Sequence, residues 1–295
     1  MADFAGHFIP GVVLFFFGLY YAFLTSMAIL RGQRLLILPL PPRDKRAQGW
    51  LQRLPMEGLV KITVSIPGIL GALFYPLGSN RFAIVDWEDP ERRFLNHNTW
   101  QHVTIYSFVF LTGLVDVVSQ SCLARQRVKL EQAALAVAFQ GTALLFLSHT
   151  EGKSALEVRC HILLVLPIIL IALVLVIELW FPDQPVLWVF KTWMTLLFGS
   201  WCAQLSSFIF YPITGHPWKP DKPGDIMFLT TFFCWHLILD ALLIAGIYAL
   251  CSLWHHRYPP QQGSKSADYQ LCPTDTSPEE LKKLLVEMNQ EHGRI

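Results

Sequence analysis

Long stretches without a charged side chain most strongly constrain what this chain can fold into. Six of them contain no Asp, Glu, Lys or Arg, and they cover residues 8–30, 62–80, 94–115, 132–150, 160–177 and 192–218. A seventh, residues 226–251, is interrupted only by Asp240. An α-helix needs about 20 apolar residues to cross the hydrocarbon core of a bilayer. The sequence therefore predicts an all-α, polytopic membrane protein with a bundle of seven transmembrane helices.

The same stretches set the expected boundaries of the helices. We expect them at residues 8–30, 59–77, 98–118, 130–149, 158–180, 186–210 and 226–251. Together they form a transmembrane domain over residues 1–254, which is followed by a polar tail over residues 255–295.

The tail carries a signal for one short helix. Ser277, Pro278 and Glu280 are typical of an N-cap and first helical turn, and apolar side chains follow at helical spacing from Leu281 to Met288. The pattern predicts an amphipathic helix at about residues 278–290, lying on the membrane surface or bound to a protein partner.

The distribution of Lys and Arg predicts how the bundle faces the membrane. No Lys or Arg precedes the first hydrophobic segment, whereas Arg31 and Arg34 follow it. With the N-terminus outside, the inner loops and helix ends carry ten Lys and Arg residues and the outer loops six. Positive residues accumulate on the cytoplasmic side of membrane proteins. We therefore expect the N-terminus outside and the C-terminus in the cytoplasm.

Five histidines lie in or beside five different hydrophobic segments: His7, His102, His149, His161 and His236. An ionisable side chain at membrane depth is costly and usually faces the bundle interior or a cavity. In the expected topology all five fall in the outer half of the bundle, because helices 1, 3, 5 and 7 enter there and helix 4 ends there. The sequence thus predicts a shared polar site near the outer face.

Other polar side chains follow the same helix faces. Asn98, His102 and Tyr106 are spaced four residues apart, and so are His236 and Asp240. Such spacing places side chains on one face of a helix. Gln204 belongs to a further polar stripe, with Ser200 and Ser207. We expect these stripes to point inward, since unpaired donors in lipid are unfavourable.

Several imidazoles in a dry pocket point first to zinc, because three neutral imidazoles and an open position make a hydrolytic zinc site. The candidate metal ligands are His102, His149, His161 and His236, of which His102, His161 and His236 are favoured by depth. The candidate catalytic carboxylates are Asp240 and Glu151. The candidate cofactor-binding residues are His7, Asn98, Tyr106 and Gln204. The leading hypothesis is a membrane zinc protein with hydrolase chemistry directed at lipids.

Two other classes of protein fit the same residues. In the first, the histidines only pack and form hydrogen bonds, and the chain is a non-catalytic interaction or trafficking protein. In the second, the histidines hold a haem or relay protons. No HExxH, G-x-S-x-G or P-loop motif is present, so no motif names an enzyme class. The net charge of +1 gives no basis for a nucleic-acid partner, and membrane lipids are the expected surroundings.

Short motifs spread over residues 6–236 carry a family resemblance. They are Gly6-His7-Phe8-Ile9-Pro10-Gly11, Trp100-Gln101-His102, His149-Thr150-Glu151-Gly152, His161 with Leu163-Leu164, Gly199-Ser200-Trp201 with Gln204, Tyr211-Pro212, and Cys234-Trp235-His236. Together they resemble the transmembrane protein 45 family, and especially its transmembrane epididymal protein branch. The resemblance implies a multi-pass protein of secretory-pathway membranes (Golgi or plasma membrane) and of the male reproductive tract, with no settled biochemical activity.

The chain departs from the commoner family pattern at two positions. Gln101 stands where a second histidine often precedes the equivalent of His102. Glu151 stands where the pattern often reads His-x-His-Gly. A site that needs these extra imidazoles is therefore not expected here, although Glu151 can supply an oxygen ligand.

Overall fold

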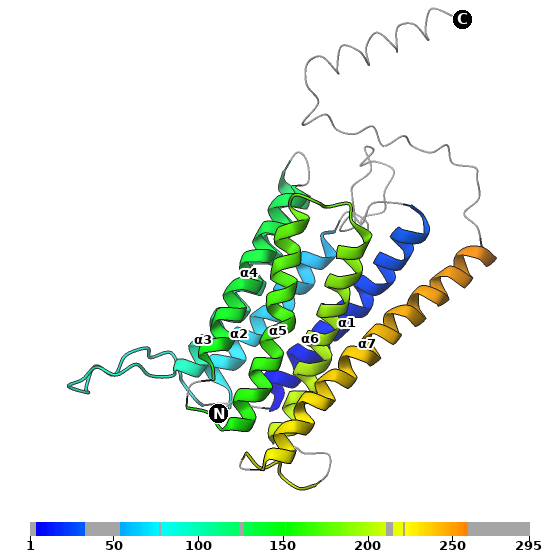
Figure 1. The fold of residues 1–295 in the computed structure, drawn as a ribbon. Coiled ribbons are helices and arrows are strands. Elements are labelled where there is room, and N and C mark those ends of the chain that lie inside the picture. The colour runs from blue at the N-terminus through cyan, green and yellow to red at the C-terminus, as the bar shows by residue number, and fades with distance from the viewer. Residues whose placement is uncertain are drawn as a thin grey trace, which may run out of the picture. The chain divides into compact units, whose positions relative to one another are not determined.

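Seven long helices make up the part of the chain that the structure describes, as the sequence predicted. The structure, a computed structural model, describes residues 4–32, 54–76, 78–123, 127–150, 152–210, 215–220 and 222–258. Over these residues, seven helices are long and apolar enough to cross a membrane (Figure 1). They are α1 (Phe4–Leu30), α2 (Met56–Phe74), α3 (His97–Val117), α4 (Val128–Ser148), α5 (Ala155–Glu178), α6 (Pro185–Phe210) and α7 (Pro223–Arg257). The helix predicted in the tail lies outside the described residues.

The helices begin one to four residues earlier than the hydrophobic pattern indicated, and in α5 polar residues form the added first turn. Before α5, the Ser154 hydroxyl accepts a hydrogen bond from the Glu157 backbone N–H, and the Glu157 carboxylate accepts one from the Ser154 backbone N–H. This reciprocal cap satisfies two donors at the helix start. It also places His161 in the second turn of a well-defined helix.

The first helix packs against the sixth along much of its length. Their backbones nearly touch, because a Cβ added to Gly11 would lie 2.4 Å from the Ala203 backbone nitrogen. A Cβ added to Gly199 would lie 2.3 Å from the backbone nitrogen of Phe15. Small residues permit this close approach between membrane helices. The contact fixes the position of α1 in the bundle, and with it the position of His7.

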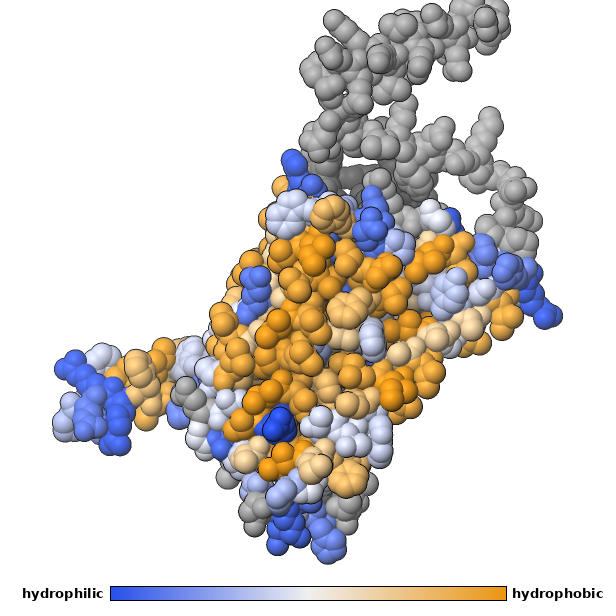
Figure 2. All heavy atoms as spheres, in the orientation of Figure 1, coloured by the Kyte–Doolittle hydropathy of each residue, from blue (hydrophilic) through white to orange (hydrophobic). Residues whose placement is uncertain are grey.

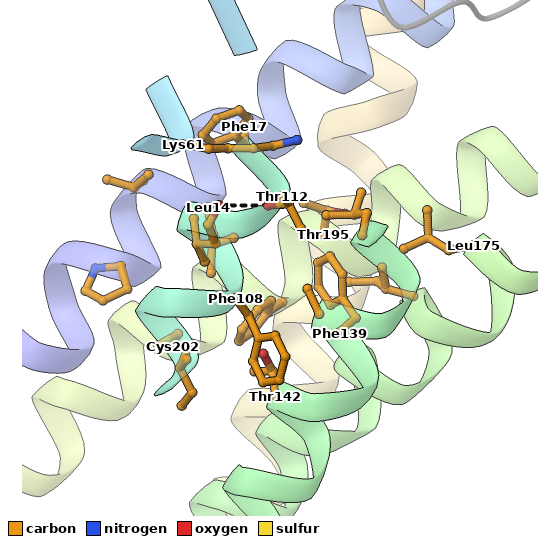
Figure 3. Close-up of a pocket in the computed structure, with 18 of the residues that line it drawn as sticks. Leu14, Phe17, Lys61, Phe108, Thr112, Phe139, Thr142, Leu175, Thr195 and Cys202 are labelled. Atoms are coloured by element: carbon orange, nitrogen blue, oxygen red, sulfur yellow. Dashed lines mark hydrogen bonds between the residues drawn. The ribbon is translucent and has the colours of Figure 1, made fainter. Parts of the chain in front are cut away.

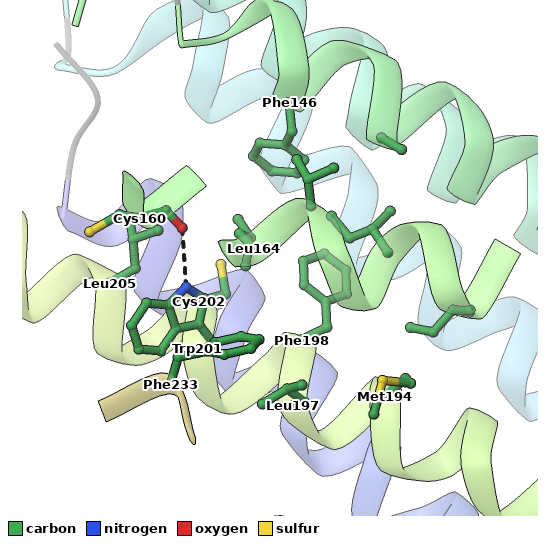
Figure 4. Close-up of a cluster of buried hydrophobic side chains, with 14 of the residues drawn as sticks. Phe146, Cys160, Leu164, Met194, Leu197, Phe198, Trp201, Cys202, Leu205 and Phe233 are labelled. Carbon is green, nitrogen blue, oxygen red and sulfur yellow. Dashed lines mark hydrogen bonds between the residues drawn. The ribbon is translucent and has the colours of Figure 1, made fainter. Parts of the chain in front are cut away.

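A buried cluster of apolar side chains between α5 and α6 forms the core. Leu164 and Ile168 are fully buried, and the Trp201 indole, also fully buried, donates a hydrogen bond to the Cys160 carbonyl oxygen at 3.1 Å (Figure 4). The remaining pairs α2 with α3, α3 with α4, and α4 with α5 also pack together. The core therefore fixes the end of α5 that carries His161 against α6.

The last helix is attached mainly through long side chains. The Trp193 indole donates to the Leu237 carbonyl oxygen at 3.0 Å, and the ring of Phe233 contacts that of Trp201 at 5.2 Å between centroids. Most of the surface of α7 is exposed. Hydrophobic side chains cover the visible flank of the whole bundle (Figure 2), as expected for helices surrounded by lipid.

Candidate metal centre

Four histidine rings meet at one end of the bundle. They come from α1, α3, the residue that ends α4, and α5. The distances between ring centroids are 6.0 Å for His7 and His102, 5.2 Å for His102 and His149, 5.2 Å for His149 and His161, and 5.8 Å for His161 and His7. His7, His149 and His161 are buried, and His102 is partly buried. The convergence expected from the topology is therefore present for four of the five histidines.

Hydrogen bonds to oxygen atoms orient three of these rings. The Nδ1 atom of His102 lies 2.8 Å from the Asn98 carbonyl oxygen, and that of His161 lies 2.7 Å from the Glu157 carbonyl oxygen. A carbonyl oxygen can only accept a hydrogen bond, so Nδ1 carries the proton in both rings. The neutral rings then carry their free lone pair on Nε2. This is the tautomer that binds a metal through Nε2.

The third oriented ring, that of His149, is held by Gln101. The Oε1 atom of Gln101 lies 2.6 Å from Nδ1 of His149, while the Gln101 amide nitrogen donates to the Ser148 hydroxyl at 2.9 Å. The Ser148 hydroxyl in turn donates to the Leu145 carbonyl oxygen. This chain of donors fixes which end of the amide faces His149. The Nε2 atoms of His149 and His161 are buried and have no hydrogen-bond partner among the described residues.

The nitrogen atoms suit zinc in kind and in spacing. One ligand atom each from His7, His102 and His149 lie within 4.8 Å of one another. Tetrahedral zinc with nitrogen at about 2.0–2.1 Å places its ligand atoms about 3.3 Å apart, so the rings need to close by no more than about 1.5 Å. Histidines that bind metals usually donate their other N–H to an oxygen, as His102 and His149 do here. The residues present therefore fit a zinc ion.

The fifth histidine does not join the other four. Nδ1 of His236 lies 3.0 Å from the Ser200 hydroxyl, which donates to Asp240 at 2.9 Å, and the His236 ring contacts Trp201. Because the hydroxyl gives its proton to Asp240, His236 is the donor toward Ser200. A catalytic triad has the opposite order, with histidine accepting the serine proton. The subset of His102, His161 and His236 favoured from the sequence is thus not brought together.

The other candidate residues fall into different surroundings. Asn98 contributes its backbone carbonyl oxygen rather than its side chain. Tyr106 lines the same cavity as His7 and His102. Gln204 lies in a second pocket, between α1 and α6, beside Ser200 and Ser207. Glu151 lies outside the described residues.

A cavity of about 210 Å³ begins at His7 and His102 and continues between the helices. Its middle part is lined by apolar side chains, among them Leu14, Phe108 and Phe139 (Figure 3). Its lining comes from α1 through α6. Two of the four clustered histidines, His7 and His102, therefore line one end of a longer interior space.

Buried ion pairs, which the sequence did not predict, form the opposite end of the cavity. Lys191 contacts Glu178 at 2.5 Å, and Lys61 lies 2.8 Å from Glu57 and 2.7 Å from Asp116. The Tyr21 hydroxyl donates to Glu57. The only feature of these residues that the sequence shows is that each charge lies at or near the end of an apolar stretch. These pairs make the inner end of the cavity polar.

Comparison with known proteins identifies the family. Residues 128–249 match the profile of a family of unknown function (DUF716). The chain is 35% identical to transmembrane epididymal protein 1A of Mus musculus, over 99% of this chain and 94% of that protein. It is 36% identical to transmembrane epididymal protein 1 of Rattus norvegicus, over 88% of this chain and 84% of that protein. It is 34% identical to transmembrane epididymal protein 1 of Homo sapiens, over 89% of this chain and 94% of that protein. This multi-pass membrane protein therefore belongs to the transmembrane epididymal protein family.

Proposed function

We propose that this protein is a membrane zinc protein that hydrolyses a lipid substrate. His7, His102 and His149 hold the metal, and His161 stands beside them. One observation carries the proposal. Buried imidazoles from separate helices converge while oxygen atoms hold Nδ1 of His102, His149 and His161, so that their Nε2 lone pairs are free to bind.

The donor set favours zinc over harder cations. Imidazole suits zinc, copper and nickel, whereas magnesium and calcium prefer oxygen. Three protein ligands with a further open position are typical of catalytic rather than structural zinc sites. When bound in such a site, zinc supplies the Lewis acidity needed for hydrolysis.

The protein's own residues supply positioning and proton transfer. Gln101, Asn98 and Glu157 hold the rings through Nδ1. His161 contacts His149 and His7, and its Nε2 has no other partner among the described residues. We assign His161 the role of accepting a proton from the attacking water. Glu151, two residues after His149, is the proposed carboxylate partner, whereas Asp240 acts only through Ser200 and His236.

The surroundings favour a substrate that is already in the membrane. The centre is buried within a bundle whose flank is apolar, and an apolar cavity leads away from it. We propose that the chain, like the wider transmembrane protein 45 family that its motifs resemble, works in secretory-pathway membranes. The names of its relatives favour the epididymis as the tissue.

Metal analysis of the purified protein tests the proposal. We expect one equivalent of zinc in the full chain, and its loss in the His102→Ala/His149→Ala variant. His236→Ala is the matched control, since that ring contacts Ser200 and Trp201 instead, and it should keep its zinc. No zinc in the full chain, a haem absorption band in its place, or equal loss in the control variant would refute the assignment.

Release of fatty acid tests the chemistry separately. The zinc-loaded protein is incubated with ester- and amide-linked lipids, and released acid is measured by mass spectrometry. We expect His161→Gln to bind zinc but to lose most of the release. Unchanged release in His161→Gln would remove that residue from the mechanism, and no release from any lipid class would refute hydrolysis.

A further inference from the structure

We propose that the interior cavity holds one acyl chain of a membrane lipid, with the carbonyl end of the chain at the histidine cluster. The position of the carbonyl end rests on the proposed function. The binding of the chain rests on the cavity alone. The ligand class is thus a lipid with a long, unbranched acyl group.

The lining of the cavity suits hydrocarbon. Between the histidines and the inner ion pairs the walls are built largely from Val, Leu, Ile and Phe side chains, such as Leu14, Ile105 and Phe139. A few polar residues, such as Thr112 and Thr142, interrupt this lining. The Thr112 hydroxyl is satisfied within its own helix, where it donates to the Val109 carbonyl oxygen (Figure 3). Apolar cavities of about 150 Å³ stay dry and take up apolar ligands. A volume of about 210 Å³ therefore favours an apolar occupant.

The length of the cavity matches one acyl chain. Along α1 the apolar lining runs from His7 to Phe17, which is about 15 Å at 1.5 Å per residue. One leaflet contributes half of the hydrocarbon core, which is also about 15 Å. Along α6 the whole lining runs from Cys202 to Trp188, about 21 Å by the same rise. A volume of about 210 Å³ spread over this length admits a single chain and not a fused ring system.

The polar inner end sets a limit to the chain. Glu178 and Lys191 form a buried ion pair there, and Glu57 pairs with Lys61. One carboxylate oxygen of Glu57 and one of Glu178 accept no hydrogen bond from the described residues. A buried carboxylate oxygen needs a polar partner, so contact with a terminal methyl group is unfavourable. The chain therefore stops short of this layer, and acyl groups beyond a fixed length are excluded.

Photolabelling in membranes tests the inference. The full chain is labelled with a lauroyl lipid that carries a diazirine at the end of its chain, and the modified peptides are identified. The test variant is Ala138→Trp, because Ala138 is 6% exposed and lines the cavity. The matched control is Val137→Trp on the same helix, since Val137 is 58% exposed on the outer surface.

We expect labelling of cavity peptides from α4 and α6 in the unmodified chain. Ala138→Trp should lower it about tenfold, because the indole fills the space that the chain would occupy, and Val137→Trp should leave it unchanged. Phe139→Ala provides a second test that adds no bulk. It widens the middle part of the cavity, so branched acyl groups should compete with the probe in this variant but not in the unmodified chain. Equal labelling in the two Trp variants, no competition by branched acyl groups in Phe139→Ala, or displacement of the probe by a sterol would each overturn the inference.

The metal content separates this inference from the proposed function. The His149→Ala variant should lose zinc but keep the cavity labelling, because the lining of the cavity includes His102 but not His149. Stoichiometric zinc together with labelling that is equal in the two Trp variants would overturn the acyl-chain inference alone. Cavity-specific labelling of a protein that never binds zinc would overturn the proposed function alone.

Discussion

A methyl group on Gly11 tests whether the contact between α1 and α6 holds His7 in place. The Cβ of alanine would lie 2.4 Å from the Ala203 nitrogen and 2.9 Å from its Cα, whereas ordinary contacts are 3.4–4 Å. Both contacted atoms belong to the backbone, so no change of rotamer relieves the clash. The two helices must therefore separate by about 1 Å, which is the gap to the shortest ordinary contact.

This separation has a cost in stability and in metal binding. Overpacking of a well-packed site costs about 1–3 kcal/mol, which corresponds to a change of roughly 5- to 150-fold in an equilibrium constant. His7 lies one helical turn before Gly11 and moves with it. The rings already have to close by up to about 1.5 Å to hold zinc, and this displacement of His7 adds to that distance. We therefore expect Gly11→Ala to lower both the unfolding temperature and the zinc content.

Gly6→Ala on the same helix is the control. No atom lies within 4 Å of a Cβ placed at Gly6, and alanine is more favourable than glycine within a helix by about 0.5–1 kcal/mol. Thermal unfolding in detergent, followed by tryptophan fluorescence, and elemental analysis measure the two effects. The reasoning fails if Gly11→Ala unfolds at the same temperature as Gly6→Ala and retains the same zinc.

Three further predictions follow from single contacts. Gln101→Leu removes the oxygen that orients His149 and should weaken zinc binding about 10- to 100-fold in a chelator competition, because hydrogen-bond partners of metal ligands contribute that much. Gln101→Glu should preserve the zinc affinity, and equal zinc affinity in both variants would contradict the role of Gln101. Lys191→Met leaves Glu178 as a buried unpaired charge and should cost about 3–5 kcal/mol; adding Glu178→Gln should restore most of the unfolding temperature, and no recovery would count against the ion pair. Trp193→Phe removes the bond to the Leu237 carbonyl oxygen and should cost about 1 kcal/mol, seen as faster amide exchange in α7; unchanged exchange would argue against this attachment.

The number and extent of the helices could be predicted because they depend on hydropathy along the chain. A stretch such as residues 160–177 without charge has few alternatives to a membrane-spanning helix. The depth of a residue also follows from its position, at about 1.5 Å per residue. This is why all five histidines could be expected in the outer half of the bundle before their contacts were known. Depth favoured the subset of His102, His161 and His236 and did not single out the four rings that meet. Which way the bundle faces in the membrane stays a prediction from its Lys and Arg residues.

The rotation and neighbours of each helix could not be predicted. His236 has a suitable depth, yet it turns toward Ser200 and Trp201. The direction of the His236 side chain depends on how α7 packs against α6. That packing is set by interhelical contacts such as the hydrogen bond from Trp193 to Leu237. The spacing of residues within one helix carries no information about such contacts.

Pairs between helices were missed for the same reason. Lys61 and Asp116 stand far apart in the sequence, and each looked like an ordinary charge at the edge of an apolar stretch. They pair because α2 packs on α3. The role of Gln101 was also not foreseen, since the residue looked like the loss of a family histidine. Its partner His149 lies on another helix, so only the packing of α3 on α4 reveals it.

The packing of α1 on α6 has a consequence for biogenesis. All four clustered histidines have been synthesised once the ribosome passes residue 161, but the helix that positions the first of them is not complete until residue 210. His7 must therefore wait in the membrane while the five helices from α2 to α6 are synthesised. A nascent chain truncated after α5 would contain every imidazole of the centre and still leave it unassembled.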